Sequence, residues 1–155
     1  MPATAGWREW VGLPGLGIGR IKAKLDTGAR TSALHALSSE RYCEGGAPYV
    51  RLRVQPRQRD GGRVLVVETA IVDERFVTDS SGHRERRIVI ASLLAVGGQS
   101  WPIEITVTNR DSLRFRMLLG RSAMQGRLLV DPDRSYLLGK PPTVPSPRRA
   151  RPRTP

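Results

Sequence analysis

Short strand-like segments bounded by turn residues occupy most of this 155-residue chain, and they restrict the folds that it can adopt. We expect strands at residues 8–14, 19–26, 49–56, 63–72, 74–79, 84–94 and 101–109. Turn residues at 15–19, 58–62 and 80–83 predict hairpins between neighbouring strands, most strongly where Asp-Gly occurs. Many short strands with little helix favour an all-β fold that closes into a barrel.

Helical signal is limited to residues 121–129, which follow the apolar run 117–120, and to a short turn after Thr31 and Ser32. Hydrophobic residues make up 39% of the chain, enough for one modest core, so we predict a single domain over residues 1–138. Residues 139–155 are rich in Pro and Arg and poor in apolar residues. This composition predicts a disordered tail.

The net charge of +12 raises the question of a nucleic-acid partner. Five cations and no acid lie in residues 139–155, so much of the excess belongs to the predicted tail. Aromatic residues are only 5% of the chain, too few to suggest stacking platforms for single strands. We therefore do not expect nucleic acid as the partner; an RNA-binding basic β-barrel is the alternative, and steep salt dependence would identify it.

Neither targeting nor membrane segments are evident in the sequence. The N-terminus lacks a basic region followed by an apolar stretch, and no run approaches the roughly 18 apolar residues of a membrane span. The single cysteine, Cys43, cannot form an internal disulfide, which fits a reducing compartment. We expect a cytoplasmic protein without a membrane partner.

Two separated motifs carry the functional information. "LDTGA" at 25–29 ends a predicted strand on Asp26, and "MLLGRSAM" at 117–124 joins an apolar strand to the predicted helix. Together, in this order, they resemble the retropepsin-like aspartic proteases. The longer stretches "WREWVGLPGLGIGRIKAKLDTGARTSALHA" and "RFVTDSSGHRERR" look like the bacterial family named ATP-dependent zinc proteases, which occurs beside RimK-type ATP-grasp ligases. The resemblance covers about residues 7–138 and implies a retropepsin-like barrel with one short helix.

The resemblance assigns Asp26 as the catalytic carboxylate. An aspartic protease needs two carboxylates that share one proton, one to activate a water and one to protonate the scissile carbonyl. The chain has one Asp-Thr-Gly, which implies a half-site per chain and a homodimer that pairs two copies of Asp26. Thr27 is expected to tie the two catalytic loops together, and Leu118, Leu119 and Gly120 to fill the space beneath them.

Further residues are expected to contact a peptide substrate. Gly28, which leaves room for a substrate backbone, is followed by Ala29 and Arg30 in the same loop. The hairpin at 74–90 resembles the flap of retropepsins, with Ser81, Gly82 and His83 at a mobile tip. An ordinary hairpin turn is the alternative.

Arg30 departs from the pattern of viral retropepsins, which place an acid or amide there. In those proteins an acid at this position pairs with the Arg that follows the apolar-apolar-Gly motif, here Arg121. We expect Glu40, Asp73 or Asp111 to neutralise the two guanidinium groups instead.

Arg84, Arg86 and Arg87 lie near the predicted flap and, with Arg30, could line the cleft with positive charge. The alternative is that they form solvated strand faces. A positive cleft predicts an acidic or glutamate-rich peptide substrate. The resemblance agrees, because the neighbouring ATP-grasp ligases add glutamates to peptides.

Zinc and ATP, although present in the family name, have little support in these residues. The candidate zinc ligands are His35, His83 and Cys43, with Asp26 as a fourth, and they lack the short paired spacings of zinc sites. "GLPGLGIGR" lacks the Lys-Ser/Thr of a P-loop. We expect no metal site and no cofactor.

Two functions fit the sequence. The first is a homodimeric retropepsin-like aspartic peptidase. The second is a catalytically weak or inactive module of the same fold that binds or regulates an ATP-grasp peptide ligase. The substitution Asp26→Asn distinguishes them, because it should abolish cleavage and spare the dimer in the first case and leave function intact in the second.

Overall fold

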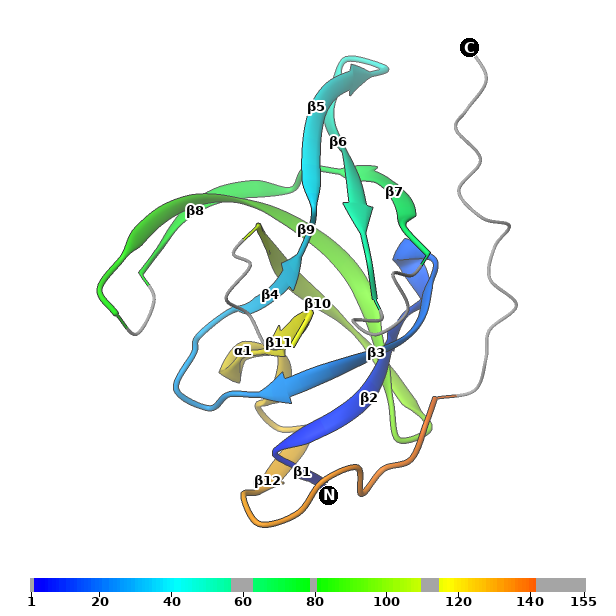
Figure 1. Ribbon diagram of the computed structural model, residues 1–155, viewed down its shortest axis with the longest axis vertical. Helices are drawn as coiled ribbons and strands as arrows, with labels where there is room; N and C mark the ends of the chain where they lie inside the picture. The colour runs from blue at the N-terminus through cyan, green and yellow to red at the C-terminus, as the bar shows by residue number, and fades with distance from the viewer. Residues whose placement is uncertain (1, 57–62, 79–80, 110–114, 142–155) are drawn as a thin grey trace.

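The computed structural model describes residues 2–56, 63–78, 81–109 and 115–141 (Figure 1). In these residues the secondary structure consists almost entirely of strands, which confirms the expected all-β class with one short helix. The elements are β1 Ala3–Gly6, β2 Arg8–Leu13, the 3₁₀ turn η1 Pro14–Leu16, β3 Ile18–Leu25, β4 Ser32–His35, β5 Ser38–Glu44, β6 Ala47–Val54, β7 Leu65–Ala70, β8 Asp73–Thr78, β9 Arg84–Val96, β10 Gln99–Thr108, β11 Met117–Leu119, α1 Arg121–Met124 and β12 Leu128–Asp131.

The main sheet closes on itself. Its strand order is β10-β4-β11-β3-β2-β9, and β9 pairs again with β10 to complete a ring, while β8 extends the sheet from β9. The hairpin of β8 and β9 curves away from the ring, and β5 and β6 project from it in another direction (Figure 1). Two smaller sheets, β1 with β12 and β5-β6-β7, complete the described structure.

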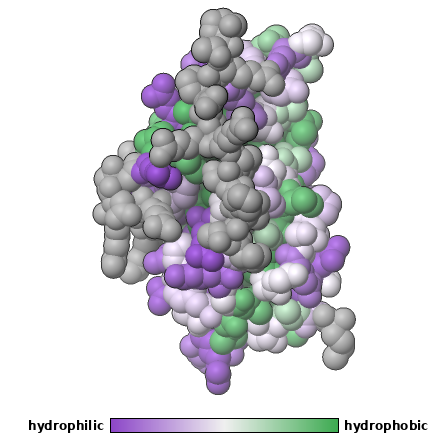
Figure 2. Space-filling model, turned by 90° about the vertical axis from the view of Figure 1, so that its right-hand side faces the viewer, coloured by the Kyte–Doolittle hydropathy of each residue, from purple (hydrophilic) through white to green (hydrophobic). Residues whose placement is uncertain are grey.

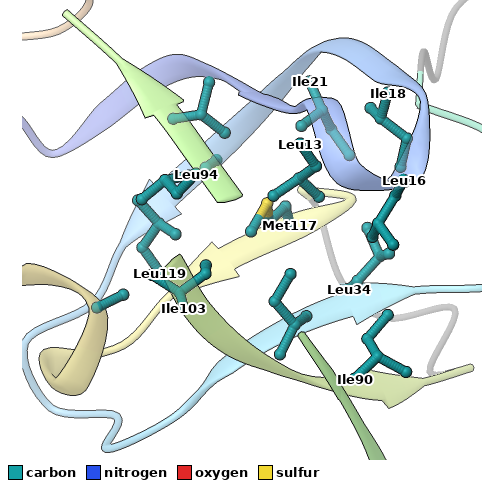
Figure 3. Packing of buried hydrophobic residues seen from close by; sticks show 14 of the residues in the cluster. Leu13, Leu16, Ile18, Ile21, Leu34, Ile90, Leu94, Ile103, Met117 and Leu119 are labelled. Atoms are coloured by element: carbon teal, nitrogen blue, oxygen red, sulfur yellow. The ribbon is translucent and has the colours of Figure 1, made fainter. Parts of the chain in front are cut away.

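The core lies inside the ring because the strands alternate in polarity. In β3, Ile21, Ala23 and Leu25 are buried, whereas Lys22 and Lys24 between them are exposed. Figure 3 shows side chains from several strands meeting in this core, among them Leu13, Leu34, Met117 and Leu119. Burying a side chain of this size contributes about 1.5–3 kcal/mol, so the central strands hold the ring together.

The structure corrects two expectations of helix. The segment after Thr31 is β4, because all four of its residues are buried between β11 and β10, where strand pairing satisfies the backbone. The helix predicted at 121–129 ends at Met124, and Leu128 and Leu129, which were expected to be helical, instead begin β12. Gly126 adopts a left-handed φ of 75° between them.

Several expectations concern residues outside the described ranges. The turn at 58–62, the first residue of the turn at 80–83 and most of the tail at 139–155 lie there. The strands β2, β3, β6, β7, β8, β9 and β10 match the predicted segments closely, whereas β1, β4, β5 and β12 were not predicted.

One face of the molecule is mixed in polarity. On the side of the molecule shown in Figure 2, hydrophilic and hydrophobic side chains are interspersed. No described helix has the length and apolar character needed to span a membrane.

Candidate active site

The loop between β3 and β4 carries Asp26 and is held from below by β11. β11 runs parallel to β3 and antiparallel to β4, so it lies between the two strands that the loop connects. The backbone amide of Asp26 donates to the carbonyl of Leu119 at 2.9 Å. At the other end, the amide of Gly120 donates to Oγ of the buried Ser32 at 3.1 Å. The expected passage of the apolar strand beneath the Asp-Thr-Gly loop is therefore present.

The residues that follow β11 fix the rest of the loop. The amides of Arg121 and Ser122 donate to the carbonyls of Ala29 and Arg30 at 2.7 and 3.0 Å, and Ser122 Oγ donates to the Arg30 carbonyl at 2.8 Å. A Cβ on Gly120 would lie 2.5 Å from the backbone of Thr31, so only glycine fits at this crossing. The two motifs recognised in the sequence thus form one hydrogen-bonded unit.

The Asp26 carboxylate lies at the surface of this unit and is partly exposed. Its Oδ1 accepts a hydrogen bond from the backbone amide of Gly28 at 2.9 Å. A Cβ on Gly28 would lie 3.1 Å from the same oxygen, so a larger residue here would press on the carboxylate. Thr27 and Gly28 are themselves exposed, so this face of the loop is accessible to a ligand or a second chain.

Asp26 opens into a cleft of about 1190 Å³. One wall is the loop itself, with Gly28, Ala29 and Arg30; the opposite wall is the hairpin of β8 and β9. Residues of β4, β10, β11 and α1, with Thr31, complete the lining. The cleft is large enough for several residues of an extended peptide.

Leu118 has a different place from the one expected. Leu119 and Met117 are buried in the core, but Leu118 points to the other side of β11 and lines the cleft. Alternation along the strand explains the difference, since only every second residue can face the core. Leu119 and Gly120 remain beneath the loop as expected.

The hairpin of β8 and β9 stands where a flap was expected. Of the predicted tip residues, Ser81 lines the cleft, whereas Gly82 and His83 are not part of its lining. Gly82 has a φ of 85°, a left-handed conformation that suits a tight turn. Phe76 and Val77 of β8 also line the cleft and were not identified from the sequence.

Four arginines line the cleft, against the carboxylates of Asp26 and Glu104. They are Arg30, Arg75, Arg87 and Arg121. Of the three arginines expected near the flap, only Arg87 belongs to this group. Arg84 instead stacks on Phe76, with its Cζ 4.1 Å from the ring centroid, and Arg86 pairs with Glu74 at 2.8 Å.

The buried arginine of the cleft is held in place by neutral and acidic groups. Arg87 is 8% exposed; its Nε donates to Glu85 at 3.0 Å and one terminal nitrogen donates to Thr106 Oγ1 at 3.3 Å. Nearby in the lining, the Thr108 hydroxyl is 3% exposed and has no hydrogen-bond partner within the described part of the chain. Arg87 is therefore fixed in the lining by its own neighbours.

Arg75 joins the flap to Glu104 of β10, which also lines the cleft. It pairs with Asp73 at 2.8 Å and with Glu104 of β10 at 2.9 Å. Hydrogen bonds from the Glu74 amide and then from Arg75 hold the pKa of Asp73 below its usual range, and the bonds to Asp73 and Glu104 raise the pKa of Arg75. The sequence analysis did not identify Arg75 or Glu104. The hairpin register pairs Arg75 with Arg87, which places these two arginines on one face of the hairpin.

The expected neutralisation of Arg30 and Arg121 takes another form. Glu40 pairs with Arg51 at 3.3 Å and Asp73 pairs with Arg75, so neither serves this purpose, and Asp111 lies outside the described ranges. Arg121 instead donates from one terminal nitrogen to the carbonyls of Thr27 and Gly28, both at 3.2 Å. At Arg121, backbone carbonyls thus take the place expected for an acid.

The candidate zinc ligands are separated in the fold. His35 is buried at the end of β4, Cys43 is exposed on β5 and His83 lies beside the flap tip. Across the described ranges, no three His, Cys, Asp or Glu side chains form a metal-binding group. Within the described residues, His35, His83 and Cys43 therefore do not form the zinc site that the name of the resembled family suggests.

Comparisons with known proteins agree with this geometry. The model of a family described as RimB-like, "Retropepsin-like aspartic endopeptidase RimB", matches residues 4–141. Proteins named "Probable alpha-L-glutamate ligase" from Shewanella pealeana and Parasynechococcus marenigrum are 44% and 47% identical over 135 and 134 residues, or 87% and 86% of this chain. The chain spans only 30% and 29% of the length of these relatives.

A solved structure is also similar. A Legionella pneumophila protein of unknown function superimposes with a TM-score of 0.72 at 27% sequence identity. The match covers 89% of this chain and 99% of that one. The arrangement of strands described above therefore recurs in a crystal structure over nearly its whole length.

Proposed function

Because the chain belongs to the RimB-like family of retropepsin-like aspartic endopeptidases, we propose that it is a homodimeric peptidase that hydrolyses peptide bonds. Membership confirms the resemblance seen in the two motifs. One observation supports the proposal above all others: Asp26 ends β3 over the crossing strand β11 and opens into the cleft. The same unit positions a catalytic carboxylate in aspartic proteases.

The proposed chemistry uses two copies of Asp26, one from each chain. Two carboxylates at about 3 Å share one proton, because both cannot be ionised at that distance. The ionised one takes a proton from water as the oxygen attacks the carbonyl carbon, and the protonated one donates to the carbonyl oxygen. The intermediate then breaks its C–N bond with proton transfer to nitrogen, which releases a carboxylic acid and an amine.

The remaining proposed roles combine the lining of the cleft with what the family resemblance implies. Gly28 and Ala29 contact the substrate backbone, and the β8–β9 hairpin closes over it and excludes water, with Ser81, Gly82 and His83 at its tip. Thr27 is exposed on the face that would meet the second chain, where its hydroxyl would join the two loops.

The charge of the cleft favours an acidic peptide as substrate. Arg30 is exposed, and Arg121 uses only one of its terminal nitrogens for loop carbonyls. Both can therefore bind carboxylates of a ligand. A glutamate-rich peptide should bind more tightly than a neutral one of equal length, and added salt should reduce the difference. Equal binding of both peptides would contradict this assignment.

The relatives support an association with a ligase. Proteins named alpha-L-glutamate ligases contain a region similar to nearly the whole described chain, and most of their length lies outside that region. A peptidase domain beside an enzyme that adds glutamates could remove them. The second candidate function is a retropepsin-like module without turnover that regulates such a ligase.

The substitution Asp26→Asn tests the proposal. Loss of one general acid–base group lowers the rate of the chemical step about 10²–10⁴-fold, so the rate of cleavage of a glutamate-tailed peptide should fall at least about 100-fold. Sedimentation should show the same dimer as the wild type. Asp133→Asn, an exposed carboxylate in the turn after β12, is the matched control and should cleave normally. Cleavage retained by Asp26→Asn would favour the regulatory module or another active site.

A further inference from the structure

A group of cations and aromatic rings lies on the outer face of β2 and β3, beside the cleft. We call it the basic strip; its members are Arg8, Trp10, Lys22, Lys24, Tyr136 and Lys140. None of its four cations forms an ion pair with a carboxylate in the described ranges. The cleft mechanism uses none of these residues.

The strand register places like charges against each other in the strip. Arg8 of β2 is directly opposite Lys24 of β3, and Trp10 is opposite Lys22. Directly opposed like charges destabilise an antiparallel pair. Since no acid among the described residues neutralises them, an anionic ligand would relieve the repulsion.

Arg8 is held in one orientation. Its Cζ lies 4.6 Å from the ring centroid of Trp7 and 5.2 Å from that of Tyr136, and its Nε donates to Ser135 Oγ at 3.0 Å. The terminal nitrogens remain for another acceptor. A guanidinium fixed in this way loses little entropy when it binds a carboxylate.

The buried carboxylate of Glu9 fixes the segment that carries Tyr136 beside β2. Glu9 is 0% exposed and accepts hydrogen bonds from the amides of Gly6, Leu137 and Leu138 at 2.7, 2.8 and 3.1 Å. The chain is thereby folded back over β2, where the amide of Tyr136 donates to the Arg8 carbonyl at 3.0 Å. Tyr136 has a φ of 55°, so the fold maintains a costly backbone conformation at this position.

The strip adjoins the cleft through one row of the sheet. Lys24 is in register with Leu118 of β11, and Leu118 is in register with Ala33 of β4. Leu118 and Ala33 line the cleft, and residues in one row point to the same face of a sheet. Neighbouring strands are about 4.8 Å apart, so a polypeptide leaving the cleft over Leu118 reaches Lys24 within two or three residues.

We propose that the basic strip binds an acidic segment of the polypeptide whose scissile bond occupies the cleft. This inference rests on the proposed peptidase function. Lys22 and Lys24 share one face of β3 and are about 7 Å apart, which equals the spacing of alternate side chains in an extended peptide. Carboxylates on every second residue of such a peptide meet the two lysines in turn.

The aromatic rings favour an acidic polypeptide over a nucleic acid. The Nζ atoms of Lys22 and Lys140 lie 5.2 and 5.4 Å from the ring centroid of Trp10, and Arg8 lies against Tyr136. These cations of the chain itself occupy the neighbourhood of the rings. Single-stranded nucleic acids stack their bases on open aromatic faces, and the described rings of this strip are already covered by cations.

The test measures binding, so that it does not depend on turnover. Fluorescein-labelled deca-glutamate is titrated with protein carrying Asp26→Asn, with and without the pair Lys22→Glu and Lys24→Glu. The pair should weaken binding at least tenfold at low salt. The control pair Arg53→Glu and Arg63→Glu makes the same charge change at exposed positions outside the strip and should stay within twofold.

Each outcome decides the proposal. If both pairs weakened binding equally, the effect would be one of net charge and the proposal would be wrong. An RNA decamer that bound more tightly than deca-glutamate and depended on the same lysines would also overturn the proposal. If the reversed charges prevent folding, the pair Lys22→Gln and Lys24→Gln removes the positive charges while keeping side chains of nearly equal size. Binding as tight as that of the wild type would then refute the proposed role of the strip. Absence of any peptidase activity in the wild type would instead refute the proposed function and leave the binding result standing.

Discussion

The buried hydroxyl of Ser32 offers a one-atom test of the unit that carries Asp26. Ser32 is 0% exposed at the start of β4, and its Oγ accepts the hydrogen bond of the Gly120 amide at 3.1 Å. Ser32→Ala leaves that buried N–H without an acceptor, which costs about 1–3 kcal/mol. For a chain of this size, each 1 kcal/mol lowers Tm by about 2–4 °C.

The assay is urea unfolding at one fixed protein concentration, because a dimer gains stability with concentration. The matched control is Ser39→Ala, an exposed serine on β5 that should change the free energy of unfolding by less than about 0.5 kcal/mol. Peptidase activity should fall in Ser32→Ala at temperatures where the variant remains folded, because Gly120 supports the loop of Asp26. Equal stability of the two variants would refute the account of this crossing.

Three further perturbations test other parts of the molecule. Glu9→Gln should lower the free energy of unfolding by about 1–3 kcal/mol in urea titrations, since an amide cannot accept all three backbone bonds that converge on this carboxylate; unchanged stability would contradict its role. Arg121→Met should lower kcat about tenfold or more and change stability by less than about 1 kcal/mol, with partial recovery in Arg121→Lys, because the side chain positions the loop by two exposed hydrogen bonds. The hydrogen bond from Arg41, and then that from Arg86, hold the pKa of Glu74 below its usual value. The ionised carboxylate therefore stabilises the flap at pH values above its pKa in the unfolded chain, and this stability is lost as the pH falls through its pKa in the folded protein. Amide exchange in β8, corrected for its intrinsic pH dependence, should therefore rise in acid for the wild type and vary less for Glu74→Gln.

The fold could be predicted where alternation was clear. In β3 and β10 the inward residues are apolar and the outward ones polar, so period and turn signals sufficed. β4 is buried on both faces and has no alternation, and β5 is exposed and polar, so neither carried a strand signal. Their pairing comes from tertiary position, which local sequence does not encode.

The candidate site was predictable only where a motif fixed it. Asp26 and the strand before Gly120 were identified because the two motifs, in that order, resemble those of retropepsin-like proteases. Arg75 of β8 and Glu104 of β10 belong to strands on either side of β9, and their ion pair depends on how the sheet curves. For the same reason, the sequence did not predict that loop carbonyls would serve Arg121.

The proposed peptidase depends most directly on the pairing of two Asp26 carboxylates. A crystal structure of the dimer with a non-hydrolysed acidic peptide would measure the distance between them. The account predicts carboxylate oxygens within about 3 Å of each other across a two-fold axis, beneath the bound peptide. A monomer, or a dimer with these carboxylates far apart, would contradict it.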